Sequence, residues 1–88
     1  MEESTQNKVP HILLVEDDRD QAYVLSHYLQ NSGYQVDWCN TPKTAFRTAH
    51  KKNYHLILLD IVLNAEEDGF HLCRQFKSDP MLKSVPII

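Results

Sequence analysis

The chain has no apolar run long enough to cross a membrane and no closely spaced pair of cysteines. Its longest uninterrupted apolar runs, 12–15 and 56–59, are far shorter than the roughly 20 residues that a membrane-spanning helix needs. Cys39 and Cys73 stand apart, without Cys-x-x-Cys spacing or an adjacent histidine at metal spacing, which argues against a zinc site and a disulfide framework. We therefore expect a cytoplasmic protein with two reduced thiols and no membrane partner.

Positive charge is also sparse. Nine Lys and Arg against twelve Asp and Glu give a net charge of −3, and the basic residues are scattered along the chain. No basic face indicates nucleic acid or anionic lipid, so we expect no direct nucleic-acid binding. A chain of 88 residues with two Gly and four Pro suits one small domain with a modest core. We expect a polar N-terminal tail over 1–10 and a domain over 11–88.

Short apolar runs alternate with segments of helical periodicity. Continuous apolar runs suit strands that are buried on both faces, whereas the second run alternates with period two and suits a strand nearer a sheet edge. The strands expected from this pattern are 11–15, 34–39, 55–59 and 85–88. Helix starts are indicated at Asp18 and at Thr41-Pro42, and a third helical stripe is formed by Leu72, Cys73 and Phe76. This order favours an α/β fold with a parallel sheet and helices on both faces.

Carboxylates follow two of the expected strands. Glu16, Asp17, Asp18 and Asp20 come directly after the first apolar run, and Asp60 comes directly after the third. Parallel strands have their carboxyl ends at one edge of the sheet, where ligands bind; if the first strand is central, Glu16-Asp17 and Asp60 meet there. Converging carboxylates repel one another without a cation, and an incomplete all-oxygen set suits Mg²⁺. One carboxylate of such a site can also attack phosphorus to give an aspartyl-phosphate.

The same residues carry a resemblance to a known family over about residues 11–88. Four segments together resemble the receiver domain of bacterial two-component response regulators: Val15-Glu16-Asp17, Leu58-Leu59-Asp60, Asp68-Gly69-Phe70 and Val85-Pro86-Ile87-Ile88. The resemblance implies a flavodoxin-like, three-layer α/β/α fold with a parallel sheet of strand order 2-1-3-4. It also implies that the family's fourth helix, fifth strand and fifth helix are not part of this sequence.

The resemblance further implies the roles of single residues. Asp60 matches the phosphoacceptor that takes a phosphoryl group from a sensor histidine kinase or a phosphotransfer protein. Glu16, Asp17, Asp60 and the backbone carbonyl of Val62 match the ligands of Mg²⁺. A register one residue later, Asp17-Asp18, stays open, although Asp18 is better interpreted as the cap of the first helix. Catalysis would be limited to self-phosphorylation of Asp60, so we do not expect an ordinary enzyme.

The sequence departs from the family pattern at two places. Position 64 is Asn where the family usually has Pro, and Gly69 stands nine residues beyond Asp60 rather than about eight, which indicates a one-residue insertion. Ile88 falls inside the expected fourth strand, before the hydroxyl residue and the lysine that complete the family's site. We expect Mg²⁺ binding to survive this and switching to be lost. A longer natural polypeptide is an equally simple explanation of where the sequence ends.

The alternative function is a truncated, non-switching interaction module. It would pair through its exposed sheet face or edge, with a homodimer as one outcome.

Other conspicuous residues have plain interpretations. An acidic stretch alone is often a solvated loop with a helix-capping aspartate. Trp38 and Tyr34 are expected to pack on the second strand. Val62 stands where a haloacid-dehalogenase-like phosphatase would have its second aspartate, which argues against that class. No partner at ligand or triad spacing accompanies the five histidines, which we expect to be structural or surface residues: His11, His27, His50, His55 and His71.

Overall fold

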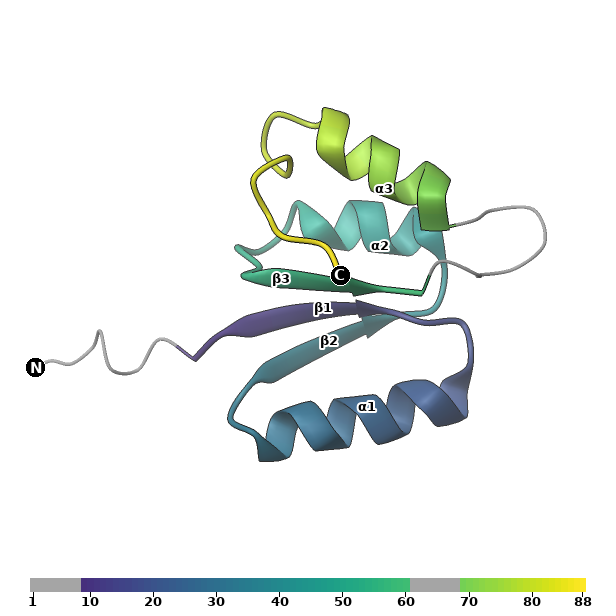
Figure 1. Ribbon diagram of the computed structural model, residues 1–88, viewed down its shortest axis with the longest axis vertical. Helices are drawn as coiled ribbons and strands as arrows, with labels where there is room; N and C mark the ends of the chain where they lie inside the picture. Colours follow the sequence, from purple (N-terminus) through teal and green to yellow (C-terminus); the bar gives the residue numbers. More distant parts are fainter. Residues whose placement is uncertain (1–8, 61–68) are drawn as a thin grey trace, which may run out of the picture.

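The computed structural model describes residues 9–60 and 69–88, with only the backbone described for 69–70. Within them lie three parallel strands, β1 (His11–Val15), β2 (Gln35–Cys39) and β3 (Leu56–Leu59), in the order β2-β1-β3 (Figure 1). β1 is central and is paired along its length with both neighbours, opposite β2 from its first residue and opposite β3 from its second. The parallel sense and the central place of the first strand confirm the predicted topology.

Three helices cover the two faces of this sheet: α1 (Arg19–Asn31), α2 (Pro42–Ala49) and α3 (Gly69–Ser78). α1 lies on one face, and α2 and α3 lie together on the other (Figure 1). The two predicted caps are present. The Asp18 side chain accepts hydrogen bonds from the amides of Asp20 and Gln21, and Thr41 accepts from the amide of Thr44. These caps satisfy amides that would otherwise lack partners, so α1 and α2 begin within a few residues of the strands before them.

The main core lies between the sheet and the α2/α3 layer. Alternate residues of β1 point into it, so Leu13 and Val15 are fully buried, as is Ile57 of β3. Phe76 of α3 is also fully buried, and its ring stacks on Phe46 of α2 with centroids 5.8 Å apart. The opposite face is also covered, because the remaining β1 residues are buried on the α1 side with Ala22. Burial on both faces explains why β1 is continuously apolar.

The expected fourth strand, 85–88, is present only as a single parallel bridge between Ile57 and Ile87. Leu59 donates its amide to the carbonyl of Ile88 at 2.9 Å, and Ile57 exchanges hydrogen bonds with the same segment. The segment therefore lies beside β3, where the order 2-1-3-4 places it. A longer ladder does not form over the described residues, and Pro86 has no amide hydrogen to contribute to one.

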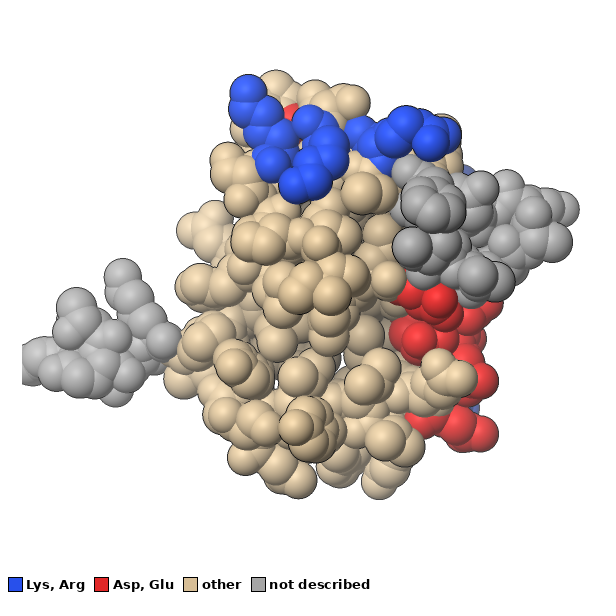
Figure 2. All heavy atoms as spheres, viewed as in Figure 1, with Lys and Arg blue, Asp and Glu red and all other residues tan. Residues whose placement is uncertain are grey.

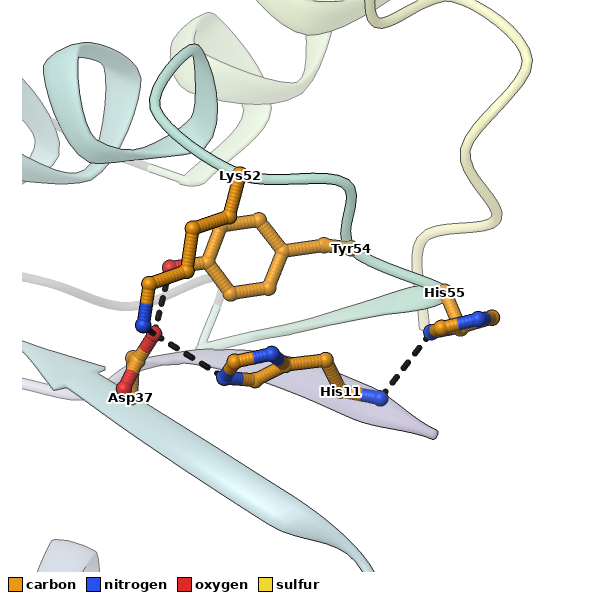
Figure 3. A network of polar contacts seen from close by, with 5 residues as sticks. All are labelled: His11, Asp37, Lys52, Tyr54 and His55. Carbon is orange, nitrogen blue, oxygen red and sulfur yellow. Dashed lines mark hydrogen bonds and ion pairs between the residues drawn. The ribbon is translucent and has the colours of Figure 1, made fainter. Parts of the chain in front are cut away.

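Asp37, in the middle of β2, is the centre of a polar network that also includes His11 at the start of β1 (Figure 3). Its Oδ2 accepts hydrogen bonds from the Tyr54 hydroxyl at 2.6 Å and from Lys52 Nζ at 3.1 Å. The same oxygen lies 3.2 Å from His11 Nε2. Burial raises the pKa of Asp37, but the hydrogen bonds from Tyr54 and Lys52 outweigh it and hold the pKa below its ordinary value. The amide of His11 donates to His55 Nδ1 at 3.0 Å, so both histidines are structural, as expected.

His50 joins the end of α2 to the turn after α3. Its Nδ1 lies 2.8 Å from the carbonyl oxygen of Phe46, and its Nε2 lies 2.8 Å from Asp79 Oδ2. Both partners are acceptors, so the ring satisfies both contacts only when both nitrogens carry protons. The hydrogen bond to Asp79, and then that to Phe46, raises the pKa of His50.

The first prediction concerns the hydroxyl of Tyr54. Tyr54→Phe should lower the free energy of unfolding by about 1 kcal/mol, because the ring stays while the short hydrogen bond to Asp37 is lost. Urea unfolding at neutral pH measures the difference. Tyr28→Phe, on an exposed side chain of α1, is the matched control and should change the free energy little. Equal stability of Tyr54→Phe and wild type would contradict the prediction.

The second prediction concerns pH. The folded-state pKa of His50 is raised above the 6.5 of an unperturbed histidine. Protonated His50 therefore stabilises the folded state, and this stabilisation is complete below that value. It is lost as the pH rises through the folded-state pKa. The loss of thermal stability caused by His50→Gln should therefore be larger at about pH 5.5 than at about pH 8.5. A loss from His50→Gln that grows with pH would refute the assignment.

Candidate functional site

Three carboxylates come together at the carboxyl ends of β1 and β3. Glu16 and Asp17 follow β1, Asp60 follows β3, and one carboxylate oxygen of each lies within 4.8 Å of the others. Figure 2 shows acidic side chains gathered at this end of the molecule. Glu16 is buried, Asp60 is half-buried and Asp17 is exposed. We call these three residues the acidic cluster; it is the convergence that the parallel topology predicts.

Backbone hydrogen bonds carry the sheet one residue beyond each strand and so fix the acidic cluster. The amide of Glu16 donates to the carbonyl of Cys39, and the amide of Asp60 donates to the carbonyl of Val15, both at 3.1 Å. The Glu16 side chain turns back, and its Oε2 accepts from the amide of Asp18 at 3.1 Å. Two of the three carboxylates are therefore attached to rigid sheet positions and not to free loops.

The electrostatics of the acidic cluster are unfavourable without a cation. Burial is the largest cause of the raised pKa of Glu16. The hydrogen bond from the Asp18 amide opposes it, and the neighbouring carboxylates of Asp60 and Asp17 raise the pKa further. The cause is physical: a buried carboxylate loses hydration, and nearby negative charges oppose its ionisation. A divalent cation would remove both costs.

The donor set fits Mg²⁺. All three side chains offer carboxylate oxygen, the hard ligand that Mg²⁺ takes, and three protein ligands leave room for the waters and phosphate oxygens that it usually keeps. Asp17 is exposed, so the cluster is open to solvent on one side. The roles of single residues as ligands stay predictions.

The other predicted site residues lie as follows. Asp18 caps α1, with Oδ1 accepting from the amides of Asp20 and Gln21 at 2.9 and 3.2 Å, and it is not among the carboxylates of the cluster. Val62, whose carbonyl was expected to complete the Mg²⁺ ligands, lies outside the described residues.

An open groove of about 240 Å³ adjoins the acidic cluster on the α1 side of the sheet. Its lining includes the polar side chains of Glu16, Asp60 and Gln21 and the apolar side chains of Leu25 and Ile88. Leu25 is 37% exposed and Ile88 is 74% exposed. Apolar surface beside β3 is therefore open on this face, as the sequence led us to expect. A groove of about 510 Å³ between α2 and α3 lies away from the cluster, with Asp79 as the one carboxylate among its lining residues.

Sequence reasoning missed one residue at this site. Trp38 of β2 was expected to pack, but its indole Nε1 donates a 2.6 Å hydrogen bond to the carbonyl oxygen of Glu16. The period-two alternation of β2 places Trp38 on the α1 side of the sheet, but it gives no sign that the ring reaches the end of the neighbouring strand.

None of the helices in the described ranges is both long and apolar enough to cross a membrane.

Comparisons with known proteins agree on one family. The family model for the response regulator receiver domain matches residues 12–88. The transcriptional regulatory protein GltR of Pseudomonas aeruginosa is 36% identical over 77 residues, which are 88% of this chain and 31% of the relative. The two-component response regulator ORR3 of Oryza sativa is 31% identical over 80 residues, which are 90% of this chain and 60% of the relative. The chain thus spans less than two thirds of either protein.

Solved structures give the same result. The chemotaxis response regulator CheY4 of Vibrio cholerae aligns at a TM-score of 0.85 with 25% identity, over 91% of this chain and 66% of that one. The signal receiver domain of a histidine kinase from Syntrophus aciditrophicus aligns at a TM-score of 0.83 with 35% identity. The alignment covers 90% of this chain and 59% of that one. A chain from the complex of histidine kinase ThkA with response regulator TrrA aligns at a TM-score of 0.81 with 25% identity. The alignment covers 90% of this chain and 66% of that one.

The third prediction follows from the repulsion in the acidic cluster. In EDTA at neutral pH, Glu16→Gln should raise the free energy of unfolding by on the order of 1 kcal/mol. The amide has no charge, can accept from the Asp18 amide, and can donate to the Asp60 carboxylate. Urea unfolding with and without Mg²⁺ measures this, and the variant should gain less from Mg²⁺ than wild type does.

Asp20→Asn is the control for that measurement. It removes one carboxylate from the first turn of α1, outside the cluster, and should be neutral or slightly destabilising because the helix start favours negative charge. A Glu16→Gln variant that is less stable than wild type in EDTA would contradict the electrostatic account.

Proposed function

The chain belongs to the receiver domain family of two-component response regulators, and on this premise we propose that it accepts a phosphoryl group on Asp60 in a phosphorelay. The observation that carries the proposal is the meeting of Asp60 with Glu16 and Asp17 at the ends of two neighbouring strands. The donor would be a sensor histidine kinase or a phosphotransfer protein. One similar solved structure is a complex of a histidine kinase with a response regulator.

Asp60 is the carboxylate of the cluster best placed to react. Glu16 is only 5% exposed, and its Oε2 is engaged by the amide of Asp18. Asp17 lies on an exposed bend. Asp60 is half-buried, is held by its amide to β1, and lines the groove through which a donor could approach. A nucleophile needs this combination of fixed position and access.

The proposed step is a transfer between a nitrogen and an oxygen. A carboxylate oxygen of Asp60 attacks the phosphorus of a phosphohistidine, and a phosphorus–oxygen bond forms as the phosphorus–nitrogen bond breaks. The electron pair leaves with the imidazole nitrogen, which takes up a proton from water. Asp60 ends as an acyl phosphate, so the chain acts as an acceptor and not as an enzyme with turnover.

We propose that Glu16, Asp17 and Asp60 hold Mg²⁺ for this step. When bound, the ion would supply positive charge that lowers the repulsion between the carboxylates and an incoming phosphoryl group. The protein's part is to hold the three carboxylates at their spacing before the donor arrives. The hydrogen bonds from the amides of Glu16 and Asp60 to the sheet do this for two of the three.

A second candidate function is favoured by the open apolar surface on the α1 side. Val24 is 64% exposed and Ile88 is 74% exposed, and an interaction module could pair with another chain, including a second copy of itself, through such a surface. In that case the acidic cluster would not need to react.

The fourth prediction separates the two candidates. Incubation of the full chain with Mg²⁺ and a small phosphodonor such as acetyl phosphate should increase its intact mass by one phosphoryl group. Asp60→Asn should abolish the gain, because the amide is not a nucleophile toward phosphorus. EDTA should also abolish it.

Asp20→Asn is again the matched control, since it removes a nearby carboxylate and should leave labelling intact. No mass gain in wild type, under conditions that label a complete receiver domain, would exclude the phosphoacceptor function. Labelling that persists in Asp60→Asn would place the acceptor elsewhere.

A further inference from the structure

Trp38 is the single tryptophan of the chain, and it lies on β2 next to the carboxyl end of β1. In the β1/β2 register it stands opposite Leu14, and its indole Nε1 donates a 2.6 Å hydrogen bond to the carbonyl oxygen of Glu16. The residue is 40% exposed, so it is not part of the core, although it lines an open hollow together with α1 residues such as Ala22. Its one polar group is engaged by the Glu16 carbonyl.

This bond gives the Glu16 carbonyl a donor that the strand ladder does not supply. In a parallel pair, a residue that donates its amide to one partner carbonyl accepts from the amide two residues further along the partner. Glu16 donates to Cys39 at 3.1 Å, so a regular ladder would bring the amide of Thr41 to the Glu16 carbonyl. Thr41 is instead the N-cap of α2, where the chain turns away from the sheet. Trp38 supplies the missing donor from its side chain.

We infer that Trp38 is a positioning residue for the acidic cluster, acting through the peptide group that joins Glu16 to Asp17. The inference rests on the proposed Mg²⁺-dependent function. The Glu16 carbonyl and the Asp17 nitrogen belong to one planar peptide unit, so a hydrogen bond that fixes the carbonyl also limits the direction in which Asp17 leaves the strand.

Asp17 is the member of the cluster that most needs such help. Glu16 and Asp60 donate their amides to sheet carbonyls, and the Glu16 side chain is held by a further amide. Asp17 is exposed on a bend beyond the strand, and no side-chain hydrogen bond is recorded for it within the described residues. Mg²⁺ demands a nearly ideal ligand geometry, so looseness at one carboxylate weakens the whole set.

The test is Trp38→Phe, which keeps an aromatic ring and removes the donor. The Mg²⁺ dissociation constant of the full chain, measured by isothermal titration calorimetry, should rise about tenfold, as is usual when a residue supporting a metal ligand is lost. Tyr54→Phe is the matched control. It also keeps a ring and loses one 2.6 Å hydrogen bond to β2. That bond goes to Asp37, the neighbour of Trp38 on the opposite face of the sheet, so the dissociation constant should stay unchanged.

A spectroscopic readout separates positioning from general stability. The indole N–H is a single NMR signal in this chain; it should exchange slowly with solvent and shift when Mg²⁺ is added. Wild-type affinity in Trp38→Phe, or an equal loss in Tyr54→Phe, would overturn the positioning role alone. Absence of Mg²⁺ binding by wild type would overturn the metal site itself, and this inference with it.

Discussion

The parallel pairing of β1 with both neighbours is the constraint on which the rest of the structure depends. Residues 12–15 are at most 2% exposed, and they are hydrogen bonded on both sides. A slip of one residue would exchange the two faces of β1, so side chains that now pack on α1 would meet the α2/α3 layer and the reverse. The same register sets Val15 opposite Leu59, which brings the next residues, Glu16 and Asp60, to one place. The packing that makes the fold unique therefore also assembles the acidic cluster.

Two carboxylates beside the sheet show opposite pKa shifts. Asp37, in the middle of β2, has three partners with positive charge or a donor hydrogen, and the pKa of its carboxyl is lowered. Glu16, at the carboxyl end of β1, is more deeply buried, accepts from the amide of Asp18 and faces two further carboxylates, and its pKa is raised. The first arrangement stabilises the folded chain by itself. The second stabilises it only when a cation is supplied, and such unsatisfied electrostatics are typical of functional sites.

How much could be predicted from the sequence follows from the range of each interaction. Strands, caps and the meeting of Glu16-Asp17 with Asp60 depend on local patterns and on one topological rule, and each was predicted correctly. The Asp37 network joins residues that are 15 to 26 positions apart, and the Trp38 bond spans 22. Local periodicity does not predict which side chain forms a hydrogen bond with a neighbouring strand. The segment 85–88 lies beside β3 as predicted, although over the described residues it forms a single bridge and not a full strand.

The position of Trp38 shows why a site of this kind also depends on residues that are neither ligands nor nucleophiles. Parallel strands end where helices must begin, so the ladder stops at the residues that carry the functional groups. Here β2 turns into α2 at Thr41, and the carbonyl of Glu16 would lose its donor at the point where its geometry matters most. A side chain near the end of the neighbouring strand can replace a backbone amide, provided that it is long, rigid and a hydrogen-bond donor. The indole of tryptophan meets all three conditions, and the aliphatic residues that usually fill strands do not.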